Sequence, residues 1–296
     1  TDSADISVGS YRIWVRDLAT TFIDLDFDAK IFVLPSIPDD IQDYGTVILS
    51  KNSWHAAAAL RKQVLNGEQK LGVINLAADT VNLPVDFIIV GSLEEKDSLA
   101  HYDNVFLYPL IELMFQDMPI KKHEDRTALT IGFHGSHTHL SKFHPHLAPA
   151  LEAIEENYQF KLKVITSNEN YVWSHGRPSI KNIEIVKWNI NTIKQHLLQC
   201  DIGIIPNITD LKQANQSFDA SNKFGLYETD FIMRYKNKSN AGRSFVFHQL
   251  GIPVVADITP SNFHILGNPD CGFVAYGQQG WKKSIETLMD STVRQQ

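Results

Sequence analysis

One segment is more informative about the fold than any other: residues 235–257, which read YKNKSNAGRSFVFHQLGIPVVAD. Ser239 or Asn240 suits the N-cap position of a helix, and Gly251 suits the C-terminal end. The residues after this glycine, IPVVA, are apolar and mostly β-branched, as in a buried strand. The segment therefore predicts a helix that leads directly into a strand, the repeating unit of an α/β fold.

The start of this predicted helix combines features that attract an anion. The first backbone N–H groups of a helix lack partners within the helix and carry partial positive charge. Lys238 and Arg243 add two full positive charges at the same place. The combination indicates a phosphate site, and the alternative is that both side chains only extend into water at a helix end.

Outward from this segment, helical and strand-like patterns alternate in two series. The first series has predicted helices at 11–22, 54–65 and 94–101, and predicted strands at 30–34, 47–50, 71–75, 87–91 and 105–108. The second has predicted helices at 142–156, 192–199, 240–250 and 281–289, and predicted strands at 129–133, 161–165, 183–186, 202–206, 252–256 and 272–275. Such alternation predicts two mostly parallel sheets with helices on their faces.

The alternation breaks between residues 109 and 126, where an apolar stretch precedes the charged run KKHEDR. This break predicts a linker between two domains, 1–120 and 127–296. Ligands of open α/β sheets bind at the carboxyl ends of the strands, which predicts a cleft where the two sheets face each other. The polar and aromatic segment 208–235 is expected to cover this cleft, to contact an acceptor or a membrane surface, or to be a surface insertion. The sequence leaves these three readings open.

Composition narrows the class of protein. A net charge of −7 argues against the broad basic surface with which proteins bind the phosphates of nucleic acids, so no nucleic-acid partner is expected. Cys200 and Cys271 lie beside apolar runs, which favours buried thiols in a reducing compartment. The sequence has no apolar run of about 18 residues and no secretory signal at its N-terminus. We therefore expect a cytoplasmic location, and association with the inner face of the membrane is left open.

Further motifs occur in a recognisable order: LTIGFHGS at 129–136, IEIVKW at 183–188, CDIGIIP at 200–206 and HQLGIPVVA at 248–256. Together with the segment KSNAGR before the last of them, they resemble the C-terminal domain of GT-B glycosyltransferases, especially the family 4-like bacterial enzymes that make surface polysaccharides. The resemblance implies two Rossmann-like domains that face each other across a cleft. It places the acceptor side in 1–120 and the nucleotide-sugar donor in 127–296.

The resemblance also implies which residues contact the donor: Gly135, Ser136, Lys187, Trp188, Ser239, Asn240 and Arg243. In the family, a glycine turn after the first strand of this domain approaches the donor diphosphate, and a glycine lets the backbone come close. Trp188 would stack on the nucleotide base, although a tryptophan that only packs against the domain is the alternative.

The sequence departs from the family pattern in one respect. Many members that retain the anomeric configuration carry two glutamates eight positions apart, and those positions hold Lys238 and Val246 here. The stereochemistry of the family therefore cannot be carried over. Lys238 is instead predicted to meet a phosphate or a sugar carboxylate, and we include it among the catalytic residues.

On the acceptor side, the segment GSYRIWVRDL at 9–18 resembles the first loop and helix of the family's acceptor domain. Arg12 would then reach the cleft, although a surface arginine on an amphipathic helix fits equally well. Lys51 and Asp79 follow predicted strands, where α/β enzymes place ligand contacts. Asp79 is the predicted acid or base, with His55 as the alternative.

Five histidines invite a metal hypothesis: His134, His137, His139, His144 and His146. They are spread over a strand end, a loop and a helix start, whereas a metal site needs ligands that converge with a supporting carboxylate. We therefore expect neither a metal ion nor a cofactor.

The leading prediction is an enzyme that transfers a sugar from a nucleotide-diphosphate sugar to a saccharide or lipid-linked acceptor, in bacterial surface-polysaccharide synthesis. One alternative is a nucleotide-sugar 2-epimerase of the same fold. Another is a non-catalytic two-domain sugar-binding protein, but a neutral sugar does not require Lys238 and Arg243 together. Peripheral contact with a membrane is left open.

Overall fold

A computed structural model describes residues 1, 4–35, 37–51, 53–63, 65, 67–76, 83–173, 176–207 and 241–296. It divides into two compact units. Among the described residues, Thr1–Leu113 belong to the first unit, and those from Met114 to the C-terminus belong to the second. No helix among the described residues is both long enough and apolar enough to span a membrane.

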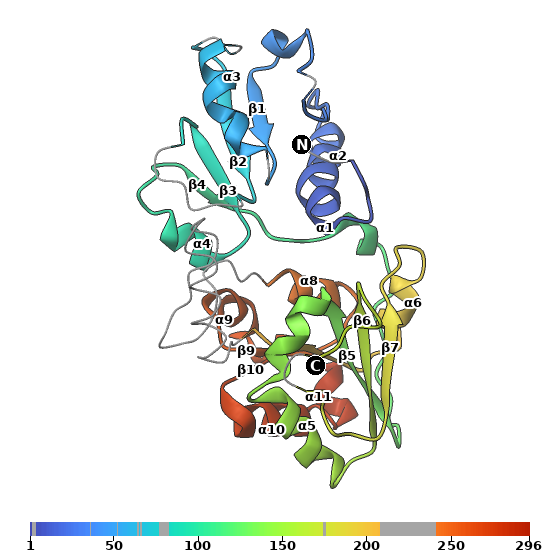
Figure 1. The fold of residues 1–296 in the computed structure, drawn as a ribbon. Coiled ribbons are helices and arrows are strands. Elements are labelled where there is room, and N and C mark those ends of the chain that lie inside the picture. The colour runs from blue at the N-terminus through green and yellow to red at the C-terminus, as the bar shows by residue number, and fades with distance from the viewer. Residues whose placement is uncertain are drawn as a thin grey trace. The chain divides into compact units, whose positions relative to one another are not determined.

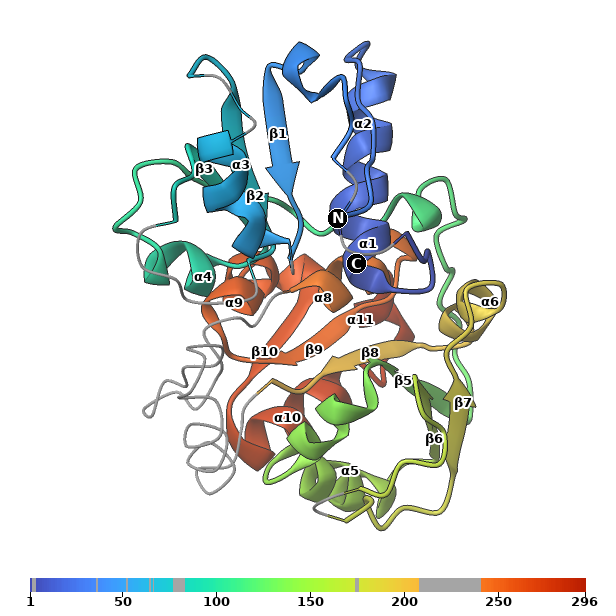
Figure 2. The same ribbon diagram turned by 45° about the horizontal axis from the view of Figure 1, so that its top comes forward.

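The described part of the first unit contains a parallel sheet in the order β1-β2-β3-β4 (Figures 1 and 2). Its strands are β1 (Thr46–Leu49), β2 (Lys70–Ile74), β3 (Phe87–Val90) and β4 (Val105–Leu107). Two of its helices are α3 (Ala57–Gln63) between β1 and β2, and α4 (Leu93–Ser98) between β3 and β4. Ser92 caps α4, because its side chain accepts a hydrogen bond from the backbone N–H of Glu95. The alternation predicted for residues 47–108 is confirmed.

The N-terminal helix consists of α1 (Gly9–Tyr11), a π-helical stretch (Arg12–Asp17) and α2 (Leu18–Asp24) in direct succession. Its buried Trp14 packs against Gly91 at the end of β3. A Cβ atom on this glycine would lie only 2.5 Å from the indole ring. The glycine therefore allows the helix to approach the sheet closely.

The prediction of a strand at residues 30–34 is wrong. This run belongs to neither described sheet, although its β-branched and aromatic residues favour extended backbone. Its backbone pairs with Thr1 instead: the N–H of Leu34 donates to the carbonyl of Thr1 at 2.8 Å, and the amine of Thr1 donates to the carbonyl of Phe32 at 3.0 Å. Strand propensity is local, whereas membership of a sheet depends on which neighbour supplies the hydrogen bonds.

The second unit contains a larger parallel sheet in the order β10-β9-β8-β5-β6-β7. Its strands are β5 (Leu129–Gly135), β6 (Phe160–Thr166), β7 (Ile183–Lys187), β8 (Ile202–Ile205), β9 (Val254–Asp257) and β10 (Gly272–Ala275). Read from the opposite edge and counted from β5, this order is 3-2-1-4-5-6, the doubly wound order of dinucleotide-binding folds. The direction of winding reverses between β5 and β8.

Helices cover both faces of this second sheet. Those described are α5 (Leu147–Glu155), α6 (Ile193–Leu198), α8 (Gly242–Gln249), α9 (Pro260–Leu266), α10 (Gly277–Thr287) and α11 (Ser291–Gln295). One hydrophobic cluster joins α5 and α10 to the sheet, and a second joins α6 and α8 to its other face (Figure 2). Four strands of the sheet (β5, β6, β8 and β9) are largely buried, as expected for parallel strands covered on both sides.

Helix α9, like the short α11, has no counterpart in the sequence prediction. It begins with Thr259, whose side chain accepts a hydrogen bond from the backbone N–H of Asn262 at 3.2 Å, followed by Pro260 at the first helical position. A threonine cap followed by proline is a recognised start signal for a helix. The signal was therefore present in the sequence, next to the strand that ends at Asp257.

The chain that enters the second unit is fixed to it by a buried lysine. The ammonium of Lys121 donates to the carbonyls of Leu198 at 2.9 Å and Cys200 at 2.7 Å, and lies 3.0 Å from the carboxylate of Asp201. Cys200 is a buried free thiol and Cys271 a half-buried one. The segment around Lys121, which lies inside the predicted linker, is thus packed as part of the second unit.

Candidate functional site

The candidate site lies where the winding of the second sheet reverses, at the carboxyl ends of β5 and β8. Helices that follow these two strands pack on opposite faces, so the loops between them diverge and leave room for a ligand. The residues at this point are Gly135 at the end of β5 and Asn207 after β8. The position of the site therefore follows from the strand order.

The turn after β5 requires glycine. Gly135 has a φ of 152°, a backbone conformation that side chains rarely tolerate. A Cβ atom there would also lie 3.5 Å from the Cδ atom of Arg243. The exposed Ser136 follows and caps a short 3₁₀ helix, His137–Phe143, and its hydroxyl accepts a hydrogen bond from the hydroxyl of Thr138 at 3.1 Å. The predicted neighbours Gly135 and Arg243 are thus brought together.

Arg243 is held in the first turn of α8 by contacts on two sides. One of its terminal nitrogens, Nη2, donates to the side-chain oxygen of Asn207 at 2.8 Å. The guanidinium carbon lies 5.4 Å from the centre of the Phe133 ring, within the range of a cation–π contact. The residue as a whole is half-buried, but its other terminal nitrogen, Nη1, is buried and has no hydrogen-bond partner in the described part of the chain.

The electrostatics of this arginine favour an anion. Burial lowers the pKa of Arg243 to about 10, and the nearby carboxylate of Asp257 opposes this shift. The guanidinium therefore stays charged at neutral pH. A buried donor without a partner carries an energetic cost that an incoming acceptor would remove. The N-terminal end of α8, which begins at Gly242, adds partial positive charge to the same place.

A buried carboxylate stands behind this arrangement. Asp257, at the end of β9, accepts hydrogen bonds from the backbone N–H of Asn207 at 2.7 Å and from the indole N–H of Trp281 at 2.8 Å. Sequence reasoning missed both Asn207 and Asp257. The available signal was their position, because each is a polar residue at or just after the carboxyl end of an apolar strand.

The two residues predicted near the nucleotide base lie farther along the sheet. Lys187 is exposed at the end of β7, which is separated from β5 by β6. Trp188 is half-buried and packs against the cluster under α6 and α8, while its backbone N–H donates to the carbonyl of Thr166 at 2.8 Å. These are packing contacts, and stacking of Trp188 on a base stays a prediction.

The residues predicted on the acceptor side lie in the first unit. Arg12 is buried and donates from Nε and Nη2 to Oε2 of Glu112, at 3.1 and 2.9 Å. Lys51 is half-buried after β1, and His55 is exposed beside Trp54. Contact of these side chains with an acceptor stays a prediction. Four other predicted residues lie outside the described part of the chain: Asp79, Lys238, Ser239 and Asn240.

The histidines of the second unit have different surroundings. His134 packs against Phe247 with 5.0 Å between ring centres, and Nδ1 of His137 lies 2.9 Å from the hydroxyl oxygen of Ser167. Within the described ranges, no group of three or more His, Cys, Asp or Glu side chains is arranged to hold a metal ion.

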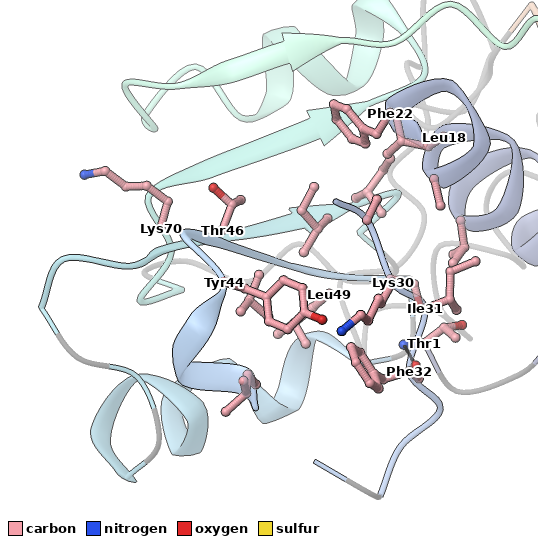
Figure 3. A pocket seen from close by; sticks show the side chains of 18 of the residues that line it. Thr1, Leu18, Phe22, Lys30, Ile31, Phe32, Tyr44, Thr46, Leu49 and Lys70 are labelled. Atoms are coloured by element: carbon pink, nitrogen blue, oxygen red, sulfur yellow. Dashed lines mark hydrogen bonds between the residues drawn. The ribbon is translucent and has the colours of Figure 1, made fainter. Parts of the chain in front are cut away.

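The first unit contains a cavity of about 660 Å³, and Figure 3 shows some of the side chains that line it. Its lining is mostly apolar and includes Leu18, Phe22 and Leu49. Lys30 in its wall is paired with Asp40 at 3.2 Å and lies 5.2 Å from the centre of the Tyr44 ring. The cavity resembles an uncovered part of the hydrophobic core more than a site for a charged ligand.

Comparison with solved structures agrees with this architecture. A crystal structure of TarM superposes with a TM-score of 0.54 at 10% identity, covering 84% of this chain and 49% of TarM. A variant of S. aureus TarM in complex with fondaparinux, alpha-GlcNAc-glycerol and UDP gives a TM-score of 0.52 with the same identity and coverage. The chain has the GT-B fold.

The GT-B likeness is a likeness of fold. AviGT4, a glycosyltransferase of avilamycin A biosynthesis, gives a TM-score of 0.49 at 11% identity over 86% of this chain and 72% of its own. The chain spans about half the length of the TarM structures it matches. No protein-family model matches this chain, and no curated protein matches its sequence.

Proposed function

We propose that this protein is a glycosyltransferase that moves a sugar from a nucleotide-diphosphate sugar to a saccharide or lipid-linked glycan. The observation that carries the proposal is the buried Nη1 of Arg243 next to Gly135, at the point where the sheet reverses its winding; this nitrogen has no hydrogen-bond partner among the described residues. That position in an α/β sheet is where ligands bind. The chemistry of the group, a charged planar donor, fits a phosphate oxygen.

The role of the site is to bind the diphosphate and to stabilise it as a leaving group. Negative charge grows on the bridging oxygen when the bond to the sugar breaks. A fixed guanidinium and the positive end of α8 would stabilise that charge without reorganising. We assign Gly135, Ser136 and Arg243 to the donor diphosphate, and we include Lys238, Ser239 and Asn240 because they directly precede α8 in the sequence.

We propose that Asp79 takes the proton from the acceptor hydroxyl, as a carboxylate after a predicted strand is able to do. The remaining roles stay as the sequence suggests them: Lys187 and Trp188 at the base, and Arg12, Lys51 and His55 on the acceptor side. We propose that the reaction takes place in the cytoplasm. If the acceptor is lipid-linked, it would be presented at a membrane surface, and the reaction would take place at the inner face of the membrane.

A test of the donor site is a thermal-unfolding panel with UDP, GDP, dTDP, ADP and CMP. UDP comes first because the TarM variant was solved with it. A ligand that binds only the folded state at a hundredfold excess over its Kd stabilises by about 2.7 kcal/mol. We expect one nucleotide to raise the Tm of the wild type by several degrees, and Arg243→Ala to weaken its binding by about 1.5–3 kcal/mol, the value of a hydrogen bond to a charged group.

The matched control is Arg177→Ala, which removes an exposed arginine from the same unit. We expect this variant to bind the nucleotide as the wild type does. The proposal fails if none of the five nucleotides raises the Tm, or if Arg243→Ala and Arg177→Ala bind equally well. If one nucleotide binds, transfer to an acceptor is measured with the sugar donor that carries this nucleotide. A sugar-binding protein would show no transfer.

A further inference from the structure

Asp257 is a buried carboxylate, and each of its two oxygens accepts a hydrogen bond. The residue is 2% exposed. One carboxylate oxygen, Oδ1, accepts the indole N–H of Trp281 at 2.8 Å, and the other, Oδ2, accepts the backbone N–H of Asn207 at 2.7 Å. Its own backbone carbonyl accepts from the side-chain amide of Asn262 at 2.8 Å. A charge this deeply buried persists only when its partners are well placed.

Asn207 connects this carboxylate to the candidate site. Its backbone N–H is held by Asp257, and its side-chain oxygen accepts from Nη2 of Arg243 at 2.8 Å. Because one residue makes both bonds, the direction of its side chain depends on the position of its backbone. The carboxylate therefore acts on the arginine through two hydrogen bonds in series.

The charges support the same connection. Desolvation lowers the pKa of Arg243, and the negative charge of Asp257 is the effect that raises it again. On its other side the guanidinium lies against Phe133, an apolar ring that provides no counter-charge. Of the charges near Arg243, the one on Asp257 thus favours the protonated state that would bind an anion.

We infer that Asp257 is a positioning residue for the anion site: through Asn207 it directs the guanidinium of Arg243 toward a phosphate bound beside Gly135. This inference rests on the proposed function of that site. Asp257 does not touch the ligand in this scheme, so it is not a catalytic residue. The bond from Trp281 to the same carboxylate connects β9 to α10 and serves the fold instead.

The experiment compares three substitutions, each of which removes a different part of the hydrogen-bond series around Asp257. Asp257→Asn removes the charge and Asn207→Ala removes the acceptor of Arg243. Trp281→Phe removes the indole donor together with part of a fully buried ring, and leaves Asn207 and Arg243 in place. The probes are inorganic pyrophosphate and UDP, titrated by calorimetry. We expect Asp257→Asn and Asn207→Ala each to raise the Kd for the probes about tenfold or more. The variant with both changes should bind the probes no more weakly than the single variant with the higher Kd, because both changes break the same series of hydrogen bonds from Asp257 to Arg243.

Trp281→Phe is the control for a merely structural role. We expect it to lower the Tm while the Kd for pyrophosphate stays within about twofold of the wild type. The inference is overturned if Asp257→Asn lowers the Tm but leaves the Kd unchanged. It is also overturned if the effects of the Asp257→Asn and Asn207→Ala changes on the Kd multiply in the double variant.

A second readout does not need a ligand. Phenylglyoxal modifies accessible arginines, and mass spectrometry gives the rate at Arg243 separately from the rate at the exposed Arg177. We expect Asn207→Ala, and Asp257→Asn where it folds, to raise the rate at Arg243 severalfold and to leave Arg177 unchanged. Equal rates at Arg243 in the wild type and in folded Asn207→Ala would reject the positioning role. Failure of the wild type to bind either probe would instead reject the proposed function.

Discussion

At the scale of single residues, burial decides what an ion pair contributes. Arg12 and Glu112 are both buried and form two hydrogen bonds. Desolvation raises the pKa of Glu112, and the charge of Arg12 opposes this shift. Removal of Glu112 takes this counter-charge away from the buried guanidinium of Arg12, so we expect Glu112→Ala to lower the free energy of unfolding by about 3–5 kcal/mol. Urea unfolding at neutral pH measures this loss.

The control at this scale is Asp40→Ala, which breaks the exposed ion pair with Lys30 in the same unit. Water screens exposed pairs, so we expect a loss below about 1 kcal/mol. Losses of equal size in the two variants would contradict the argument. They would mean that Arg12 finds another way to compensate its charge when Glu112 is absent.

At the scale of elements, one glycine sets how closely a helix packs on the second sheet. A Cβ atom on Gly203 in β8 would lie 2.6 Å from the ring of Phe247, a fully buried residue of α8. The ring is buried in the core and would have to shift to make room for the added methyl group, so Gly203→Ala should lower the free energy of unfolding by about 1–3 kcal/mol. Because α8 carries Arg243, we also expect nucleotide binding to weaken. Chemical unfolding and the nucleotide panel measure the two effects.

Gly280 in α10 is the matched position. A Cβ atom there would meet Ala275 at 3.6 Å or more, an ordinary contact. Alanine is the better helix former, so Gly280→Ala should leave stability unchanged or raise it by up to about 1 kcal/mol. A destabilised Gly280→Ala, or an undisturbed Gly203→Ala, would show that packing of these helices is looser than the structure indicates.

At the scale of the whole molecule, two histidines couple folding to pH. Desolvation lowers the pKa of His123 and of His248 from the ordinary value of 6.5. For His123, the charges of Lys121 and Arg294 act in the same direction, while the backbone carbonyl of Gly251 and the charge of Asp201 oppose them. The unfolded chain thus binds protons at a higher pH than the folded chain does.

This difference in proton binding means that the two histidines make the folded protein more stable as the pH rises. Their stabilising contribution is fully present above pH 6.5 and is lost as the pH falls through the lower folded values. Each proton taken up on unfolding gives a slope of at most about 1.4 kcal/mol per pH unit. We expect the variant with both His123→Gln and His248→Gln to show a flatter decline of stability below pH 6.5. The exposed His264→Gln should keep the slope of the wild type, and an unchanged slope in the double variant would refute the assignment.

Local patterns in the sequence were sufficient for most elements of the second unit. The strands β5 and β8 are mostly apolar runs, β6 carries apolar residues around its lysines, and α8 precedes Gly251 and the strand β9 as the segment 235–257 predicts. The run at 30–34 was misread because extended propensity does not say which neighbour will pair with it. Helix α9 was missed although Thr259 and Pro260 marked its start.

The sequence by itself determined the α/β class, the two series of elements and Arg243 as a candidate residue, because these depend on short-range periodicity and on residue type. Gly135 became a candidate through the resemblance to GT-B enzymes. Only the tertiary structure decided that Asn207 and Asp257 stand behind Arg243. Asn207 is 36 residues from Arg243 and 50 residues from Asp257 along the chain. Strand order alone brings the ends of β5, β8 and β9 together, and strand order depends on how whole helices and strands pack, which no local pattern specifies.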